Sequence, residues 1–337
     1  MPVPAPLAQC LDKQAEAAVA GGLVPGLSVA LVQRTAPTWA ATYGVTDRSS
    51  PAPVEASTVF EGASLSKPLV AYGALLLVQD GQLDLDRPMD SYLPGPYLPH
   101  EPAAAMITAR MALGHTTGYP NWRQAEQLNL VRAPGSHFGY SGEGYVQLGR
   151  VIEHLTHQPL GAFLSERVLQ PLGLADSSFT WSPAFEHRVA RGHAKNGEAV
   201  PKDKPAEAVA PSSLHTTATD FARFLAVVLN PADAAPLGPD GVHAMLTPHV
   251  QLAGPLAWGL GWGLDDSAAG DRVFWQWGDN DGYKAFAAGS PGGGVGVVVL
   301  TNGANGLDVA KPLVQTILPT LKVPFAAAPD LGRYARP

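Results

Sequence analysis

Cysteine is nearly absent from this sequence: Cys10 is the only one among 337 residues, so the chain cannot form an internal disulfide. Charged residues are also scarce, at 15% of the chain, and the formal net charge is -7. No basic run or interleaved aromatic stripe offsets this negative charge. The composition therefore argues against a nucleic-acid partner.

Long apolar runs are missing as well. No uninterrupted apolar segment approaches the roughly 18 residues that a membrane span requires. The first six residues lack the positive and apolar regions of a signal peptide, so we expect a soluble, cytoplasmic protein without a membrane span. His154 and His157 have no third ligand nearby, and the glycines at 292–296 precede a strand instead of following one. We therefore expect neither a metal nor a cofactor.

Glycine and proline are abundant, with 36 and 32 residues spread along the chain, and they indicate many ordered turns. The length exceeds that at which a single core stops growing, so we expect two lobes or domains. Apolar spacing predicts helices at 7–20, 107–113, 145–155, 161–169, 221–229 and 308–318, and strands at 27–33, 38–43, 258–264, 273–277, 284–288 and 295–301.

This order of elements predicts the fold class. Strands near both chain ends with helices between them predict an α/β (α+β) fold, in which an antiparallel sheet built from both ends is flanked by helices. The middle of the chain would form a mostly helical inserted lobe. We expect a discontinuous sheet-containing domain at 1–82 and 250–337, and a helical domain at 83–249.

The segment from Phe60 to Val78 contains the first candidate for chemistry. A helix that begins near Ser64 places Lys67 on the same face, beside the serine hydroxyl. A serine is a weak nucleophile until a neighbour takes its proton, and a lysine can do so only if its pKa is lowered. The residues after Pro68 have no polar face, which predicts a helix buried on all sides and a desolvated Lys67. The alternative is a serine cap beside a solvated lysine. Ser66 would point away from Lys67.

A glycine-rich loop at 138–144 contains the second candidate. Its glycines would let Tyr140 project from a tight turn that enters a helix. A tyrosine near a cationic lysine can lose its proton more easily, or it can relay a proton between nucleophile and leaving group. The alternative is an aromatic side chain that plugs the end of the helix.

The third candidate is the segment 275–284. A strand edge with a glycine can bring a backbone N–H close to a substrate carbonyl, and with the N–H of Ser64 it would form an oxyanion hole. The alternative is a hairpin turn with two tryptophans that cover the sheet. His115 is expected to brace a loop. No Gly-x-Ser-x-Gly sequence surrounds Ser64, Ser66 or Ser141, which argues against an α/β-hydrolase.

Together these stretches resemble the penicillin-recognising serine hydrolases, in the branch of class C β-lactamases, D-alanyl peptidases and family VIII esterases. The resemblance extends over nearly the whole chain, through segments 59–67, 81–86, 113–118, 140–142 with 148–153, 171–174 and 298–302. It implies that Ser64 is the acyl-forming nucleophile, that Lys67 and Tyr140 exchange its proton, and that the N–H groups of Ser64 and Asp279 hold the oxyanion.

Two positions depart from the β-lactamase pattern. Gly142 stands where that pattern has an asparagine that binds the substrate amide, and neutral Gln276 stands where it has a lysine or histidine that holds a substrate carboxylate. Both departures affect recognition of a carboxylated substrate. Trp277 and Gly278, followed by Asp279, are similar to the Trp-Gly-Gly motif of family VIII esterases. The resemblance implies that Gly142, Gln276, Trp277 and Gly278 bind the substrate.

The sequence therefore predicts a serine hydrolase that forms an acyl-enzyme on Ser64, an esterase for small-molecule ester or amide substrates. The alternatives are a β-lactamase or D-amino-acid peptidase, or a non-catalytic binding protein on the same scaffold, which the changes at Gly142 and Gln276 motivate. The sequence leaves the natural substrate and the oligomeric state open.

Overall fold

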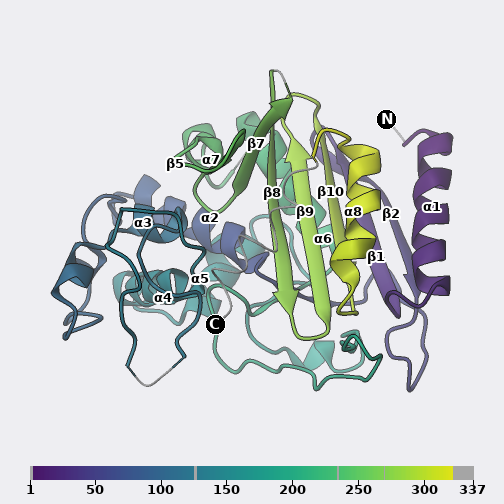
Figure 1. The fold of residues 1–337 in the computed structure, drawn as a ribbon, viewed down its shortest axis with the longest axis horizontal. Helices are drawn as coiled ribbons and strands as arrows, with labels where there is room; N and C mark the ends of the chain where they lie inside the picture. Colours follow the sequence, from purple (N-terminus) through teal and green to yellow (C-terminus); the bar gives the residue numbers. More distant parts are fainter. Residues whose placement is uncertain (1–2, 125–126, 234, 269, 322–337) are drawn as a thin grey trace.

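A computed structural model describes residues 3–124, 127–233, 235–268 and 270–321. In this part of the chain, eight strands form one antiparallel sheet in the order β2-β1-β10-β9-β8-β7-β6-β5. Figure 1 shows the purple N-terminal strands beside the green and yellow C-terminal strands. The strands are β1 (Gly26–Gln33), β2 (Ala36–Gly44), β5 (Val250–Gln251), β6 (Leu256–Trp258), β7 (Gly263–Ala268), β8 (Asp271–Asn280), β9 (Tyr283–Ser290) and β10 (Val295–Thr301).

The sheet joins distant parts of the sequence, because β1 lies between β2 and β10. Leu27 pairs with Thr301, and Gln33 pairs with Val295. Both β1 and β10 are buried along nearly their whole length, as expected for central strands covered on two faces. The predicted sheet from both chain ends is confirmed.

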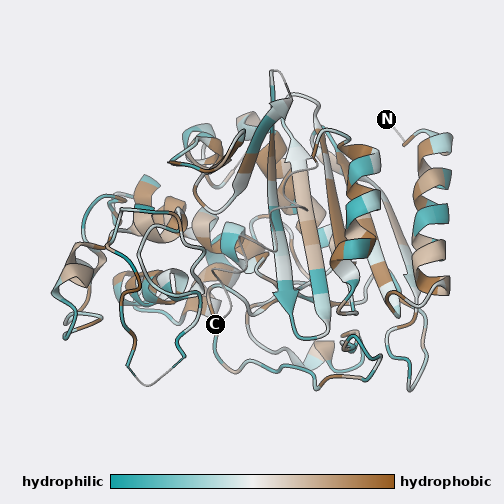
Figure 2. Ribbon diagram, viewed as in Figure 1, coloured by the Kyte–Doolittle hydropathy of each residue, from teal (hydrophilic) through white to brown (hydrophobic). Residues whose placement is uncertain are grey.

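Helices cover both faces of this sheet. On one face α1 (Ala5–Ala20) packs against α8 (Gly306–Ile317), and α8 packs on β9 and β10. On the other face α6 (Ala218–Leu229) packs on β1 and β10. Hydrophilic and hydrophobic stretches alternate along α1 and α8, as expected for helices with one buried face (Figure 2). The N-cap of α6 is Thr217, whose side chain accepts a hydrogen bond from the backbone of Asp220.

The middle of the chain is mostly helical and lies beside the sheet (Figure 1). Its helices are α3 (Ala109–Leu113), α4 (Gly142–Thr156), α5 (Leu160–Leu164), α7 (Pro239–Leu246) and a π-helical turn at Ser165–Leu169. Short 3-10 turns occur at Met89–Tyr92, Pro102–Met106, Pro183–Phe185 and Pro231–Asp233. The predicted bounds of the two domains stay a prediction. Residues 322–337 of the predicted sheet-containing domain lie outside the part of the chain that the structure describes.

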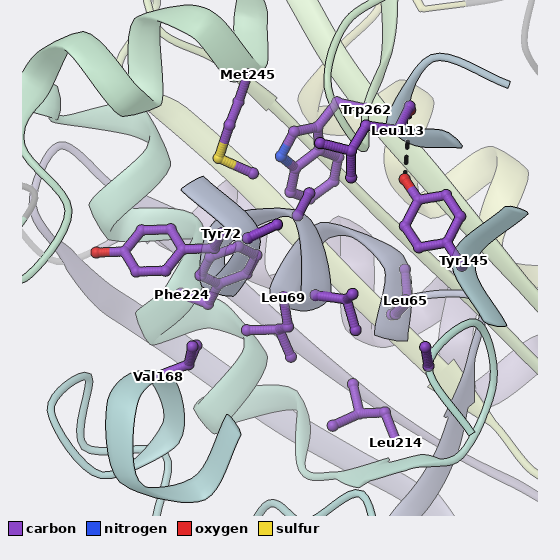
Figure 3. Close-up of a cluster of buried hydrophobic side chains, with 14 of the residues drawn as sticks. Leu65, Leu69, Tyr72, Leu113, Tyr145, Val168, Leu214, Phe224, Met245 and Trp262 are labelled. Atoms are coloured by element: carbon purple, nitrogen blue, oxygen red, sulfur yellow. Dashed lines mark hydrogen bonds between the residues drawn. The ribbon is translucent and has the colours of Figure 1, made fainter. Parts of the chain in front are cut away.

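One helix lies at the centre of the larger core. It is α2 (Ser66–Gln79), whose residues 66–77 are all buried, in agreement with its predicted lack of a polar face. Figure 3 shows Leu65, Leu69 and Tyr72 among side chains from several other segments, including Phe224, Met245 and Trp262. Pro68 lies in the first turn of α2, where its missing N–H has no partner to lose. The helix ends before Gly81, which has a φ of +70°.

A two-stranded sheet leads into α2. It pairs β3 (Phe60–Ala63) with β4 (Leu214–Thr216), and most of the helical middle region lies between these two strands in the sequence. All four residues of β3 are buried, and β3 contacts β8 and β9 of the large sheet. This arrangement holds the residues before α2 between the sheet and the helical region.

Candidate active site

Ser64 lies in the turn between β3 and α2. The preceding residue, Ala63, has a φ of +48°, an unusual value for a residue with a Cβ atom. Residues 61–63 and 65–70 are buried, whereas Ser64 is partly exposed. The chain therefore presents this hydroxyl to solvent from an otherwise buried segment, as a nucleophile requires.

Lys67 is fully buried one turn after Ser64. Its Nζ lies 2.9 Å from Ser64 Oγ and donates to the backbone oxygen of Pro211 at 3.2 Å. The rings of Tyr140 and Tyr145 lie 4.7 and 5.7 Å from the same nitrogen. No carboxylate of the described residues forms an ion pair with Lys67.

Burial lowers the pKa of Lys67 well below its ordinary value, because the ammonium form loses its hydration without gaining a counterion. The predicted desolvation is thus present. A neutral amine at hydrogen-bond distance from a hydroxyl can take the proton of that hydroxyl. The pair Ser64 and Lys67 has the geometry of a nucleophile with its base.

Ser66 has a different environment. Its Oγ donates to the backbone oxygen of Ala63 at 2.6 Å and accepts from the backbone N–H of Leu214 at 3.0 Å. These bonds tie α2 to β3 and β4. Ser66 is fully buried, so its hydroxyl has a structural environment.

Tyr140 is buried between two other rings. His115 lies 4.2 Å from it and Trp277 lies 4.8 Å from it, measured between ring centroids. The phenol accepts a hydrogen bond from Gln276 Nε2 at 2.8 Å. Burial raises the pKa of Tyr140, and hydrogen bonding to its neighbours lowers it by less. Easier proton loss under the influence of Lys67, one of its two predicted roles, is therefore wrong. The proton relay remains.

The third stretch forms the end of β8. Gln276 is fully buried, and its Nε2 also donates to the backbone oxygen of Ser64 at 3.2 Å. Trp277 is only 6% exposed and packs on Tyr140. Asp279 Oδ1 forms an ion pair with Lys284 Nζ at 2.8 Å, and 36% of this carboxylate side chain is exposed. Substrate contact through Gln276, Trp277 and Gly278 stays a prediction.

The predicted oxyanion donors lie on neighbouring segments. Ser64 follows β3, and Asp279 follows Gly278 on β8, where the two strands are in contact. A Cβ atom on Gly278 would come within 3.2 Å of the Cβ of Ala63, the residue before Ser64. The N–H groups of Ser64 and Asp279 are therefore carried close to one another, and their role at an oxyanion stays a prediction.

Gly142 is the first residue of α4 and is buried. Its N–H donates to both the backbone oxygen and the Oδ1 of Asn121. A Cβ atom at this position would lie 3.0 Å from the backbone oxygen of Asn121 and 3.2 Å from the ring of Trp122. Asn121 and Trp122 thus lie where a side chain at position 142 would begin. The role of Gly142 in substrate binding stays a prediction.

Three contributors to the site were not predicted as such. Pro211 contributes only a backbone oxygen, which carries no sequence signal. Tyr145 faces Lys67 from α4, and its place five residues after Tyr140 could have indicated it.

His115 was expected to brace a loop, and it does so: its Nδ1 accepts from the backbone N–H of Ser141 at 3.1 Å. Its stacking on Tyr140 was not foreseen. Burial and the nearby Lys67 lower the pKa of His115 well below its ordinary value, which favours a neutral ring.

Residues 11–320 match the Beta-lactamase family. The chain belongs to this family. Penicillin-binding protein 4 of Amycolatopsis lactamdurans is 28% identical over 342 residues, with 87% of this chain and 88% of that protein covered. Protein Flp of Staphylococcus aureus (strain N315) is 25% identical over 315 residues, with 87% of this chain covered. The match spans 63% of the length of Flp.

A solved structure supports the fold. The D-alanine carboxypeptidase AmpC from Burkholderia cenocepacia superposes with a TM-score of 0.82 at 22% identity, and the match covers 94% of this chain and 99% of that one. The predicted resemblance and fold class are confirmed, as is the broad prediction of a serine hydrolase related to β-lactamases. None of the helices in the described residues has the length and apolar composition to cross a bilayer. Within the same residues, no cluster of three or more His, Cys, Asp or Glu side chains could hold a metal.

Proposed function

We propose that this member of the family is an esterase that forms an acyl-enzyme on Ser64. The observation that supports it most directly is the position of a fully buried Lys67 amine 2.9 Å from the hydroxyl of a partly exposed serine. Without a counterion the amine is favoured in its neutral form, in which it can accept a proton.

The reaction uses two half-steps. Lys67 takes the proton of Ser64 while the Oγ atom attacks the ester carbonyl, and the oxyanion accepts hydrogen bonds from the N–H groups of Ser64 and Asp279. The bond between the acyl carbon and the oxygen of the leaving alcohol then breaks, and this oxygen receives a proton from Tyr140. Water attacks the acyl-enzyme in the second half-step and releases the acid.

The charges around the site favour neutral substrates. The two positions where related enzymes hold the amide and carboxylate of a peptide-like substrate carry Gly142 and the neutral Gln276. Lys284 is paired with the carboxylate of Asp279 beside the end of β8, so this lysine offers a substrate anion little net attraction. An uncharged ester has no carboxylate, so it does not need a cation at position 276 in order to bind.

Labelling with a fluorophosphonate, read by intact mass, tests the nucleophile. We expect one adduct on the wild-type protein and on Ser66→Ala, and none on Ser64→Ala. Ser66→Ala is a matched control, since it removes a hydroxyl two residues away that has a structural environment. An adduct on Ser64→Ala, or none on the wild type, would overturn the proposal, and the second outcome would favour a non-catalytic binding protein.

A substrate panel separates the esterase from its alternatives. The names of the relatives keep a β-lactamase or D-amino-acid peptidase as the second candidate. We expect turnover of short p-nitrophenyl esters with a kcat/KM well above that for nitrocefin or a D-alanyl peptide. Preferred hydrolysis of nitrocefin or the peptide would place the chain with the second candidate.

A further inference from the structure

Trp122 is an aromatic side chain that the fold leaves open to solvent. It is 40% exposed, and it is the only aromatic residue among the large exposed apolar side chains of the described residues. The other six tryptophans are buried or half-buried. An indole left in water forgoes the apolar contact that burial would give it. A single exposed apolar residue is ordinary, so the surroundings of Trp122 decide whether it has a function.

The two neighbours of Trp122 in the sequence are bonded to the start of α4. The backbone oxygen of Asn121 accepts from the N–H groups of Gly142 at 2.9 Å and of Glu143 at 3.0 Å. On the other side, Arg123 Nη2 forms an ion pair with Glu143 Oε1 at 3.1 Å, and this glutamate side chain is only 5% exposed. The backbone at position 122 is therefore held from both sides. A ring on a fixed backbone loses little freedom when it meets a ligand.

The ring of Trp122 lies over Gly142, near the catalytic tyrosine. A Cβ atom on this glycine would lie 3.2 Å from Cη2 and 3.3 Å from Cζ3 of the indole. Ser141, which joins Gly142 to Tyr140, is extended, with φ -135° and ψ 118°. Because alternate residues of an extended backbone face the same side, the indole lies on the side toward which Tyr140 points. The ring of Tyr140 lies 4.7 Å from Lys67 Nζ, so this side is that of the nucleophile and its base.

Trp122 is out of reach of a short acyl group on Ser64. Residues two apart in an extended chain are separated by about 7 Å, so position 142 lies well beyond Tyr140. An acetyl group ends one carbon beyond its carbonyl and stays in the space around Lys67 and Tyr140. A longer acyl group that ends in a ring can span the additional distance to the indole.

The start of α4 offers little to a polar acyl group. The first N–H groups of a helix normally attract anions and other acceptors. Here those of Gly142 and Glu143 already donate to Asn121, and that of Gly144 is bonded within the cap of the helix. The positive charge of Arg123 is paired with Glu143. The exposed group beside these satisfied donors is the apolar indole.

We propose that Trp122 is a specificity-determining residue, whose indole contacts the acyl part of the ester and selects esters of aryl-substituted acids, such as phenylacetic acid, over acetates. This inference rests on the proposed function. Two aromatic rings in contact attract one another beyond the gain from apolar burial, by up to about tenfold in an equilibrium constant. Gly142 allows this placement of the indole, because any larger residue there would press on the ring.

Two p-nitrophenyl esters test the contact, the phenylacetate and the acetate, since they share a leaving group and differ only in the acyl part. We expect the wild type to have the higher kcat/KM for the phenylacetate. Trp122→Ala should lower the ratio of the two values about 10-fold, and Trp122→Phe, which keeps an aromatic ring, by less than about 3-fold. The control is Leu23→Ala, which removes an exposed apolar side chain after α1, far from α4 in Figure 1, and should leave the ratio unchanged.

The shared leaving group makes the outcomes distinct. If the indole contacted the p-nitrophenyl group, or if the variants only lost folded protein, both esters would lose rate equally. An unchanged ratio in Trp122→Ala would therefore overturn the inference, and so would a wild type that prefers the acetate.

Boronic acids give a second measurement that does not depend on turnover, because they add reversibly to a nucleophilic serine. Benzylboronic acid carries the side chain of the phenylacetyl group, and methylboronic acid that of the acetyl group. Trp122→Ala should weaken inhibition by the first about 10-fold relative to the second. Equal changes for both acids would contradict the contact. Wild-type protein that a fluorophosphonate does not label at Ser64 would instead contradict the proposed function, so the two failures are distinguishable.

Discussion

Gly278 lies so close to Gly62 that a Cβ atom on Gly278 would be 2.4 Å from the backbone oxygen of Gly62. Real Cβ atoms do not approach a backbone oxygen this closely. The contact fixes the distance between β8 and β3, and these strands carry the two predicted oxyanion donors. A glycine is needed at position 278 because of this close approach.

Replacing this glycine should disturb the oxyanion hole. For Gly278→Ala we expect kcat/KM for a p-nitrophenyl ester to fall about 10²- to 10³-fold, the usual cost of one lost oxyanion donor. Gly95→Ala is the matched control, since a Cβ there meets no atom within 4 Å and its φ is not positive. Equal activity of both variants in steady-state kinetics would mean that the spacing of β3 and β8 is unimportant for catalysis.

The lowered pKa of Lys67 predicts the pH dependence of activity. Only the neutral amine can act as a base, so kcat/KM should rise with pH and level off below the ordinary pKa range of lysine. Lys67→Ala should lose about 10³-fold or more, as Ser64→Ala does, because the two residues act as a unit. A pH series on a p-nitrophenyl ester checks both. An activity that rises only where free lysine titrates would contradict the desolvated base.

Glu61 should make the stability depend on pH. It is only 5% exposed, and its Oε2 accepts from Asn280 Nδ2 at 2.8 Å. Burial, together with the charges of Asp203 and Asp281, raises the pKa of Glu61 to about 7. Between its ordinary pKa and about 7, the folded protein binds more protons than the unfolded chain. The free energy of unfolding should therefore decrease as pH rises through this window, by on the order of 3 kcal/mol.

Glu61→Gln should remove this dependence and keep an acceptor for Asn280. Urea unfolding from pH 4.5 to 8 would measure the difference between the two proteins. The variant should become the more stable one as pH rises. Parallel stability curves over the whole range would show that Glu61 titrates normally.

A cation at position 276 tests the proposed preference for neutral substrates. Gln276 is fully buried, and its amide donates to Tyr140 Oη. Gln276→Lys should therefore slow the hydrolysis of neutral esters, since it removes the oriented amide. The ratio of kcat/KM for a penicillin to that for a neutral ester should still rise by about fivefold or more, because a buried cation is screened less than an exposed one, whose pairing contributes up to about 1 kcal/mol. Gln276→Met should leave this ratio unchanged, and an equal ratio in all three proteins would contradict the idea.

The sequence predicted the elements that have strong local patterns. Helix α4 has a clear apolar face and occurs within a few residues of its predicted bounds, and α2 begins near Ser64 and is buried on all sides, as its apolar sequence predicted. The predicted strand 258–264 is instead two strands, since Gly261 turns between them with a φ of +89°. Strand β3 was missed because it has four residues and pairs with β4 about 150 residues later. Helix α7 was missed although Pro239 and Asp240 mark its start.

In the candidate site, too, the sequence predicted the local contacts and missed those between distant residues. Ser64 and Lys67 are neighbours on one helical turn, so their spacing alone indicated their contact. The bond between Gln276 and Tyr140 joins residues 136 positions apart, and no local pattern records it. Burial at such a site depends on every segment packed around it. The neutral character of Gln276 could be read from the sequence, whereas its contact with Tyr140 could not.

The pairing of β1 with β10 also governs how the chain can fold during synthesis. Strand β1 leaves the ribosome early, but its central partner follows only after roughly 260 more residues. At about 5 to 20 residues per second, this interval lasts some tens of seconds. For that time β1, which is apolar on both faces, has an unpaired edge of the kind that promotes aggregation. A sheet built from both ends of the chain thus leaves an apolar strand without its partner for most of the time that synthesis takes.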